Sequence, residues 1–389
     1  SLMAIAAAIT FIISTSYSMN LYNGLVADVQ QRAEMYTKLE QIDTYVRAYY
    51  NGSINEDKLI ESLAQAYISV LGSDSAEYYD AEAYTLYKEH LSGTHLGIGI
   101  YADEGGGCPL ITDVLANSPA AAVGVSIGDS IVEINGQSVI EMGYDKAYSM
   151  LRAENGTPLT ITLRSGGEDR TVDLTSVQMT VASVKAVSFD GYGYIKVYEF
   201  SERTYQQFMA AYSMLLSSED TKGLIIDLRN NGGMIFEPVF NLLNTILPKD
   251  SIPYISTNLA GEDTNADPAS GNYSTNRPIT VLVNSRTQGP AELLAASLAD
   301  NCGARIIGSQ TAGNAQLRET YALYDNTAIA LPIATLKAPQ TQFSGTGIKP
   351  EYEVVMLADT EADLIALDSV TDGCIKKAIE VLSQTVAQN

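Results

Sequence analysis

The first stretch of the chain is almost continuously apolar. Residues 2–19 are nearly all apolar or small, and no charged side chain occurs before Asp28. A run of this length is typical of a segment that crosses a bilayer. We therefore predict a single-pass signal anchor over 1–27, truncated at its start because no initiator methionine or basic segment precedes it, with the bulk of the chain extracytoplasmic at the cell membrane. A cleaved signal peptide and a buried core helix are the alternatives.

Residues 28–91 show a different pattern, in which apolar positions recur three and four residues apart. This spacing places them on one face of a helix. The segment "DVQQRAEMYTKLEQIDTYVRAYY" predicts one helix, and two or three shorter helices are expected after it. Ser53 or Asn55 is expected to cap the second helix. We interpret 28–91 as a helical tether.

Between 92 and 175, short alternating runs are separated by glycine-rich turns, which predicts a small β domain. In "SIVEINGQSV", Asn135 and Gly136 favour the positive φ angles of a two-residue hairpin turn. One helix is expected in "YDKAYSMLRAE", and "PLTITLRS" is expected to close the block as a strand.

From 176 to 365, buried hydrophobic strands alternate with amphipathic helices. The strands are expected in "GYGYIKVYEF", "KGLIIDL", "RPITVLVN", "ARIIGSQ" and "AIALPIATLKAP". This alternation predicts an α/β domain with a mostly parallel sheet. We expect 257–276 to be a polar loop and 366–389 to form a final helix. The predicted fold class is therefore multi-domain α/β.

Composition narrows the possible functions. The chain has 389 residues, with 23 Lys and Arg against 46 Asp and Glu and a net charge of −23. Because nucleic-acid binding needs a basic surface, we expect no nucleic-acid partner. The cysteines are far apart and the two histidines, His90 and His95, complete no metal-ligand pattern, so we expect no metal site and no cofactor. We interpret both histidines as surface or linker residues, away from the candidate site.

Two motifs in residues 92–175 resemble the PDZ family. "SPAAAVGVSIGDSIVEINGQSV" is similar to that family's central stretch, and "HLGIGI" falls where the family binds the terminal carboxylate of a peptide. The resemblance implies that backbone amides of this loop hold the carboxylate while the peptide adds as a strand. The loop residues are Leu96, Gly97, Ile98 and Gly99. Arg152 is either a sensor of the bound peptide or a solvated helix charge, and the alternative for the block is a β domain with purely structural glycines.

The order of segments resembles the carboxyl-terminal processing peptidases, the S41 family of serine peptidases. Besides the PDZ block, the resemblance rests on "GYIKVYEFSERT", "KGLIIDLRNNGG", "AELLAASLAD", "IIGSQTAGN" and "GTGIKPEYEV". It implies a crotonase-like core, of the ClpP/crotonase type, that cleaves proteins near their C-termini after the PDZ domain has recruited the tail. The implied chemistry is a Ser-Lys dyad, in which a neutral lysine is the general base for the serine.

The residues that the family uses for this chemistry are replaced in this chain. When the segments are aligned through Asn284 and Glu292, the nucleophile position falls on Gly289. The position of the lysine, in the turn "TAGN", is Asn314. A position that assists the lysine in the family is Arg318 here.

The implied oxyanion hole is also altered. In the family, one backbone N–H comes from the residue after the serine, which here is Pro290 and has no N–H. The other comes from a glycine turn, in which Gly233 is kept and Met234 replaces the second glycine. We therefore predict a pseudoprotease that binds protein C-termini and regulates an active S41 relative.

Two other functions stay open on the sequence alone. An active serine-type or threonine-type endopeptidase would need a relocated nucleophile, for which Thr287 and Ser285 in the same turn are the candidates. A structural module with an occluded PDZ domain would bind nothing. Asp227 and Arg229, at the end of "IIDLR", are interpreted as a structural ion pair rather than as part of a site.

Overall fold

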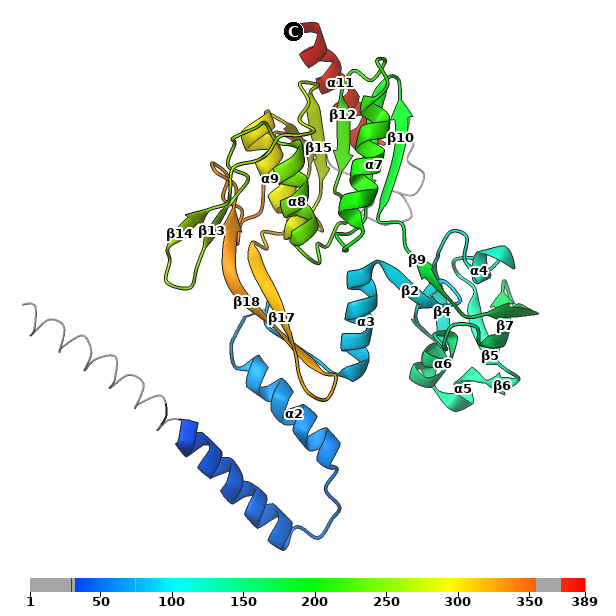
Figure 1. Cartoon of the computed structure of the whole chain (residues 1–389). Coiled ribbons are helices and arrows are strands. Elements are labelled where there is room, and N and C mark those ends of the chain that lie inside the picture. The colour runs from blue at the N-terminus through cyan, green and yellow to red at the C-terminus, as the bar shows by residue number, and fades with distance from the viewer. Residues whose placement is uncertain (1–28, 30–31, 74, 355–371, 389) are drawn as a thin grey trace, which may run out of the picture. The chain divides into compact units, whose positions relative to one another are not determined.

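The computed structural model describes residues 29, 32–73, 75–354 and 372–388 (Figure 1). It separates into two compact units, residues 1–63 and 64–389. The predicted signal anchor over 1–27 lies outside the described residues. Within the described ranges, no helix is both long enough and apolar enough to span a membrane.

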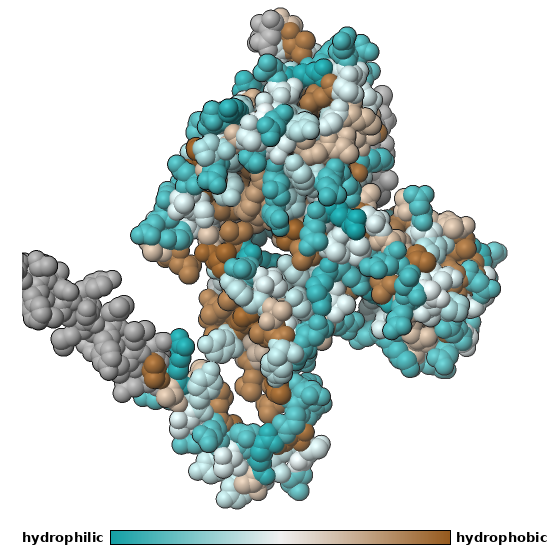
Figure 2. Space-filling view, viewed as in Figure 1, coloured by the Kyte–Doolittle hydropathy of each residue, from teal (hydrophilic) through white to brown (hydrophobic). Residues whose placement is uncertain are grey.

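Among the described residues, a helix covers 32–49, and α2 (Glu56–Ser69) follows it. The side-chain oxygen of Asn55 accepts the N–H of Lys58 at 3.0 Å, which confirms Asn55 as the cap of α2. Many apolar side chains of these helices are exposed, among them Tyr49 at 81%, and Figure 2 shows hydrophobic surface along them.

The segment predicted as a helical tether over 28–91 contains a strand. β1 (Glu77–Tyr79) pairs antiparallel with β18 (Ala328–Lys337), and α3 (Ala81–Ser92) follows β1. The prediction of a purely helical segment was therefore wrong for β1. A strand of three residues is too short to show a period of two, and its pairing partner lies far away in the sequence.

The predicted β block contains a sheet in the order β3-β4-β5-β7-β8, with β6 also paired to β5. β2 and β9 form a separate two-stranded sheet. The strands of the block are β2 (Thr94–Gly97), β3 (Ile100–Gly105), β4 (Cys108–Val114), β5 (Ser130–Ile134), β6 (Gln137–Ser138), β7 (Pro158–Ser165), β8 (Glu168–Thr175) and β9 (Val177–Thr180), and its helices are α4 (Pro119–Ala122), α5 (Val139–Met142) and α6 (Tyr144–Leu151). As predicted, Asn135 and Gly136 turn the β5–β6 hairpin, with φ angles of +51° and +75°. Ile131, Ile161 and Leu151 belong to the single core of this block.

The α/β part contains a six-stranded sheet. Its order is β10 (Val184–Phe189), β11 (Tyr192–Val197), β12 (Leu224–Asp227), β15 (Ile279–Val283), β16 (Arg305–Gly308) and β19 (Tyr352–Glu353). Only the β10–β11 pair is antiparallel, which confirms the predicted mostly parallel sheet. Because β12 and β15 are parallel neighbours, the turns that follow them meet at one edge of the sheet.

Helices cover both faces of this sheet (Figure 1). Leu224 and Ile226 of β12 belong to the core shared with three helices, α7 (Thr204–Leu216), α8 (Glu237–Ile246) and α9 (Pro290–Cys302). Ile225, between them, points to the other face, where α11 (Gly373–Gln388) packs. Burial on both faces explains why these strands are continuously hydrophobic in the sequence.

A second sheet is antiparallel and has the order β1-β18-β13-β14, with β17 (Gln316–Ala322) also paired to β18. β14 (Asp263–Asn265) lies within 257–276, the segment expected to be a polar loop, and forms a hairpin with β13 (Ile255–Thr257). That expectation was therefore wrong for β14. All residues of β14 are exposed and polar, so the sequence shows no hydrophobic alternation there.

A buried ionic network joins β11, β12 and the start of α11. The guanidinium of Arg229 lies 2.5 Å from the Asp227 carboxylate and 2.8 Å from that of Asp372. The Lys196 ammonium lies 3.4 Å from Asp227, and the Tyr194 hydroxyl donates to it at 2.6 Å. Burial by itself would raise the pKa of Asp227, but Lys196 and Arg229 hold it well below its usual range. The interpretation of Asp227 and Arg229 as a structural pair is confirmed.

Asp227→Asn should lower the free energy of unfolding by about 3–5 kcal/mol, because two buried cations lose their shared countercharge. The folded-state pKa of Asp227 is depressed, so its stabilisation is present above about pH 4 and is lost as the pH falls towards the folded value. Urea unfolding should therefore show a difference from wild type that is large at pH 7 and smaller at pH 3. Asp220→Asn, at an exposed site, is the control, and an Asp227→Asn effect no larger than the control contradicts the prediction.

Candidate functional site

The turn between β15 and α9 is built around Gly289. Its φ of +58° and ψ of −117° lie in a region that residues with a Cβ rarely adopt. A Cβ here would meet the carbonyl oxygen of Asn314 at 3.7 Å and the ring of Phe236 at 3.9 Å, which is ordinary contact. The turn therefore has room for a side chain, although its backbone favours glycine. It also places Gly289 beside Asn314, the two positions that the resemblance pairs.

The carboxylate of Glu292 holds these two turns together. Glu292 is fully buried in the first turn of α9. One of its oxygens accepts the N–H of Gly289 at 3.0 Å and that of Asn314 at 2.8 Å. Its other oxygen accepts the N–H of Gly313 at 2.7 Å and the hydroxyl of Thr311. Donors from two distant segments thus converge on one carboxylate.

The electrostatics of Glu292 reflect this enclosure. Burial raises the pKa of its carboxyl above the ordinary value, while the hydrogen bonds from Thr311 and the three backbone N–H groups act in the opposite direction. All of these partners are donors, and an ionised carboxylate offers only acceptors. Both carboxylate oxygens of Glu292 therefore accept hydrogen bonds from the protein itself.

The glycine turn after β12 packs against Pro290. A Cβ on Gly233 would approach Cδ of Pro290 to 2.7 Å, so the two predicted oxyanion positions are in contact. The N–H of Gly233 donates to Oδ1 of Asn231 at 2.9 Å, and Pro290 has no N–H. Met234 has a φ of +144°, which glycine adopts with less strain. One predicted oxyanion donor is thus used internally and the other does not exist.

The two alternative nucleophiles have different surroundings. Thr287 is fully buried, and its hydroxyl donates to the carbonyl of Leu228 at 2.9 Å and accepts the N–H of Asn284 at 2.9 Å. These bonds connect the turn after β15 to the end of β12, which is a structural role. Ser285 is exposed in the same turn.

Arg318 does not meet the other candidate residues. Its guanidinium lies 3.4 Å from the carboxylate of Glu77 and 3.3 Å from the hydroxyl of Tyr79. It therefore links β17 to β1. The exposed side chain of Asn314 instead accepts the N–H of Gln316 at 3.3 Å within its own turn.

The predicted carboxylate loop connects β2 to β3, and β3 is an edge strand among the described strands of its sheet. An edge strand is where a peptide can add. A Cβ on Gly97 would meet the carbonyl oxygen of Leu151 at 2.8 Å, so the close approach of α6 requires glycine. The N–H of Ile98 donates to the same carbonyl at 3.3 Å, and the N–H of Leu96 donates to the Glu89 carboxylate at 3.4 Å.

The structure contradicts one of the two interpretations of Arg152 and the interpretation of His95. Arg152 forms an ion pair with Glu89, and only 13% of its side chain is exposed, so the reading as a solvated helix charge was wrong. His95 is 2% exposed, and its Nε2 lies 3.6 Å from the position of a Cβ on Gly97, so it is neither on the surface nor remote from the candidate residues. Pairing of β2 with β9 buries it. Burial, together with Arg152 and His90, lowers the pKa of His95 to about 4.

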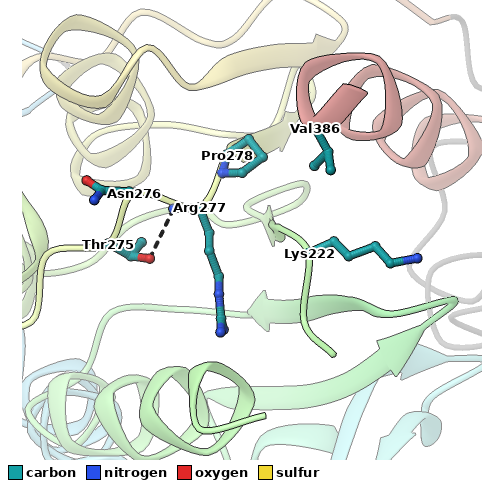
Figure 3. A pocket seen from close by; sticks show the side chains of 6 residues that line it. All are labelled: Lys222, Thr275, Asn276, Arg277, Pro278 and Val386. Carbon is teal, nitrogen blue, oxygen red and sulfur yellow. Dashed lines mark hydrogen bonds between the residues drawn. The ribbon is translucent and has the colours of Figure 1, made fainter. Parts of the chain in front are cut away.

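A surface cavity of about 410 Å³ lies away from these residues (Figure 3). Its lining consists of Lys222, Thr275, Asn276, Arg277, Pro278 and Val386. Several of these residues precede β15, whereas the candidate site follows it, and the guanidinium of Arg277 already donates to the carbonyls of Leu216 and Ser218. In the part of the chain that the structure describes, no group of three or more His, Cys, Asp or Glu side chains is arranged to hold a metal ion.

Comparison with known proteins agrees with the two parts of the chain described above. Residues 191–354 match the model of peptidase family S41, and residues 110–165 match a PDZ domain model. The chain contains a peptidase S41 domain and a PDZ domain. The resemblance drawn from the sequence motifs is thereby confirmed.

Relatives of this S41 chain are named for carboxy-terminal processing. The carboxy-terminal-processing protease of Bartonella bacilliformis is 28% identical over 316 residues, which cover 79% of this chain and 72% of that protein. The carboxy-terminal processing protease CtpA of Bacillus subtilis is 27% identical over 323 residues, which cover 82% and 68%. The solved structure of the photosystem II D1 C-terminal processing protease has a TM-score of 0.49 and 21% identity, and covers 83% of this chain and 88% of that one.

Two glutamates of the S41 and PDZ sites were not predicted as site residues. The role of Glu292 could have been predicted, because a glutamate three residues after a helix cap often binds back to the backbone of the cap. The role of Glu89 could not have been predicted from the sequence, because a glutamate on an amphipathic helix is usually solvated. Its partner Arg152 is 63 residues away, in the PDZ domain.

Glu292→Gln should destabilise the S41 domain by about 1–3 kcal/mol, because an amide nitrogen then faces backbone N–H donors that lose their acceptor. Urea unfolding followed by circular dichroism measures the change. The matched control is Glu237→Gln, an exposed glutamate in the first turn of α8, which should change the stability by no more than about 0.5 kcal/mol. Equal midpoints for the two variants would show that the Glu292 bonds do not stabilise the site.

Proposed function

We propose that this chain is a C-terminal processing peptidase-like protein that binds protein C-termini through its PDZ domain and does not hydrolyse them. The observation that carries this proposal is the chemistry of the two paired turns. Gly289 and Asn314 are neighbours, and neither supplies a nucleophile or a general base. The carboxylate that joins them is satisfied by the protein's own donors.

The missing groups are those on which serine-peptidase chemistry depends. Loss of the nucleophile lowers kcat by about 10⁶-fold in the serine peptidase where this has been dissected. Loss of one oxyanion donor lowers it by about 10²–10³-fold. Here Pro290 lacks the N–H and the Gly233 N–H is bonded to Asn231. A peptide bound at these turns would meet neither a serine at position 289 nor a lysine at position 314.

Peptide binding needs none of these groups. The PDZ domain retains an edge strand in β3, a glycine loop before it and a cation in Arg152. Together these features support strand addition by a peptide whose carboxylate lies at the loop. The names of the relatives support the C-terminus of a protein as the recognised feature. The second partner that we propose is an active S41 relative, which this chain would regulate.

We also propose a single-pass anchor over 1–27 in the cell membrane, with both domains extracytoplasmic. The uncharged, apolar composition of 2–19 supports it. The full chain should sediment with membranes after a carbonate wash and be released only by detergent. A variant with Asp residues in place of Ile12 and Ile13 should appear in the aqueous fraction, and full-length protein in that fraction would contradict the anchor.

The proposed function predicts binding without cleavage. Purified full chain should bind a pool of fluorescent peptides with free carboxyl ends at micromolar Kd and should release no fragments over a day. The same peptides with amidated ends should bind about tenfold more weakly, because they lack the charge that pairs with Arg152.

The opposite outcome identifies the second candidate function. Cleavage that copurifies with the protein, together with labelling by a serine-reactive fluorophosphonate, would show an active endopeptidase. Loss of that labelling in Ser285→Ala or Thr287→Ala would assign the relocated nucleophile. The burial of the Thr287 hydroxyl makes Ser285, which is exposed, the variant to test first.

A further inference from the structure

The carboxylate loop of the PDZ domain already holds a carboxylate from this chain. Glu89 of α3 forms an ion pair with Arg152 and accepts the N–H of Leu96 in a long hydrogen bond of 3.4 Å. Only 16% of the Glu89 side chain and 13% of the Arg152 side chain are exposed. A guanidinium and a loop N–H are the groups that would bind the terminal carboxylate of a peptide.

Two histidines lie close to this ion pair. His95 is buried, and its Nδ1 has no hydrogen-bond partner among the described residues. After burial, the charge of Arg152 is the next cause that lowers the pKa of both His90 and His95. Arg152 is thus a cation close to both histidines, and Glu89 is its ion-pair partner.

A peptide added to β3 would end near the loop that Glu89 contacts. The hydroxyl of Tyr144 in α6 donates to the carbonyl of Ala102 in β3 at 2.8 Å, so α6 lies beside this edge strand. α6 ends at Leu151, directly before Arg152. A strand added to β3 would run past α6 and place its last residue at the loop that Glu89 now contacts.

We infer that Glu89 is an internal stand-in for the terminal carboxylate of a peptide ligand, which must displace it to bind. This inference rests on the proposed function and deepens it. Displacement exchanges one carboxylate for another at Arg152, so the buried guanidinium is never left without a countercharge. A ligand without a free carboxylate cannot replace Glu89 as the partner of Arg152.

The helix that carries Glu89 is held in place at both ends. Its start follows β1, which pairs with β18. At its end, Nε of Arg203 donates to the carbonyl of Ser92 at 3.0 Å. α3 therefore presents Glu89 to the loop as a tethered competitor, whose effective concentration is high.

The expected consequence is a lowered apparent affinity for peptides. When the binding-competent state is only a fraction of the population, the apparent Kd rises in inverse proportion to that fraction. Couplings between sites commonly change affinity by about 5–150-fold. We expect about tenfold for Glu89.

The test compares Glu89→Gln with wild type in the full chain. The probe is a pool of fluorescein-labelled decapeptides with free carboxyl ends and with Ala, Val and Leu randomised at the last three positions. Glu89→Gln removes the charge at nearly constant size and should lower the Kd, measured by fluorescence anisotropy, about tenfold. Glu82→Gln, exposed on the same helix, is the matched control and should bind like wild type. The amidated pool should gain nothing from Glu89→Gln.

Each result decides the inference. Equal affinity of wild type and Glu89→Gln for the free-carboxyl pool overturns the inference and leaves the proposed function standing. An equal gain in affinity for the amidated pool has the same meaning. Absence of binding in every protein overturns both. Should Glu89→Gln lower the unfolding midpoint, Glu89→Asp, whose carboxylate is one methylene farther from Arg152, is measured instead. That variant should also bind more tightly than wild type, and an unchanged Kd counts against the inference.

Discussion

The arrangement of the S41 site depends on the buried carboxylate of Glu292. A carboxylate can be buried at low cost only when donors satisfy it, and here they come from the turn before α9 and from the turn before β17. The two turns are therefore constrained to fold together. This constraint involves backbone N–H groups and not the side chains at Gly289 and Asn314. The turns can thus keep this arrangement whatever side chains stand at positions 289 and 314.

Three acids show how the partner of a buried charge decides its role. Asp227 is enclosed by two cations and a hydroxyl, and Glu292 by donors of the chain itself, so both are permanent parts of the S41 domain. Glu89 is partly exposed, and its main partner is a single guanidinium. A peptide carboxylate offers that guanidinium the same interaction. Of the three acids, Glu89 is therefore the one that a ligand can replace.

Much of the fold was predictable because the signals are local. The buried strands, the amphipathic helices, the cap at Asn55 and the hairpin turn at Asn135 each depend on residues within a few positions of one another. β1 and β14 were missed because short strands are stabilised by their pairing partners, not by their own pattern. His95 was misread for a similar reason, since pairing with β9 buries it.

The sequence by itself determined which chemical groups stand at the positions that the family resemblance assigns to the dyad and the oxyanion hole. A glycine has no nucleophile, an asparagine is not a base and a proline has no N–H, wherever they lie in space. Only the tertiary structure decided how the remaining groups are used, because the partner of a polar group is chosen when distant segments pack. The N–H of Gly233 and the hydroxyl of Thr287 are taken up by internal acceptors, and Arg152 is paired with a glutamate from a helix outside the PDZ domain.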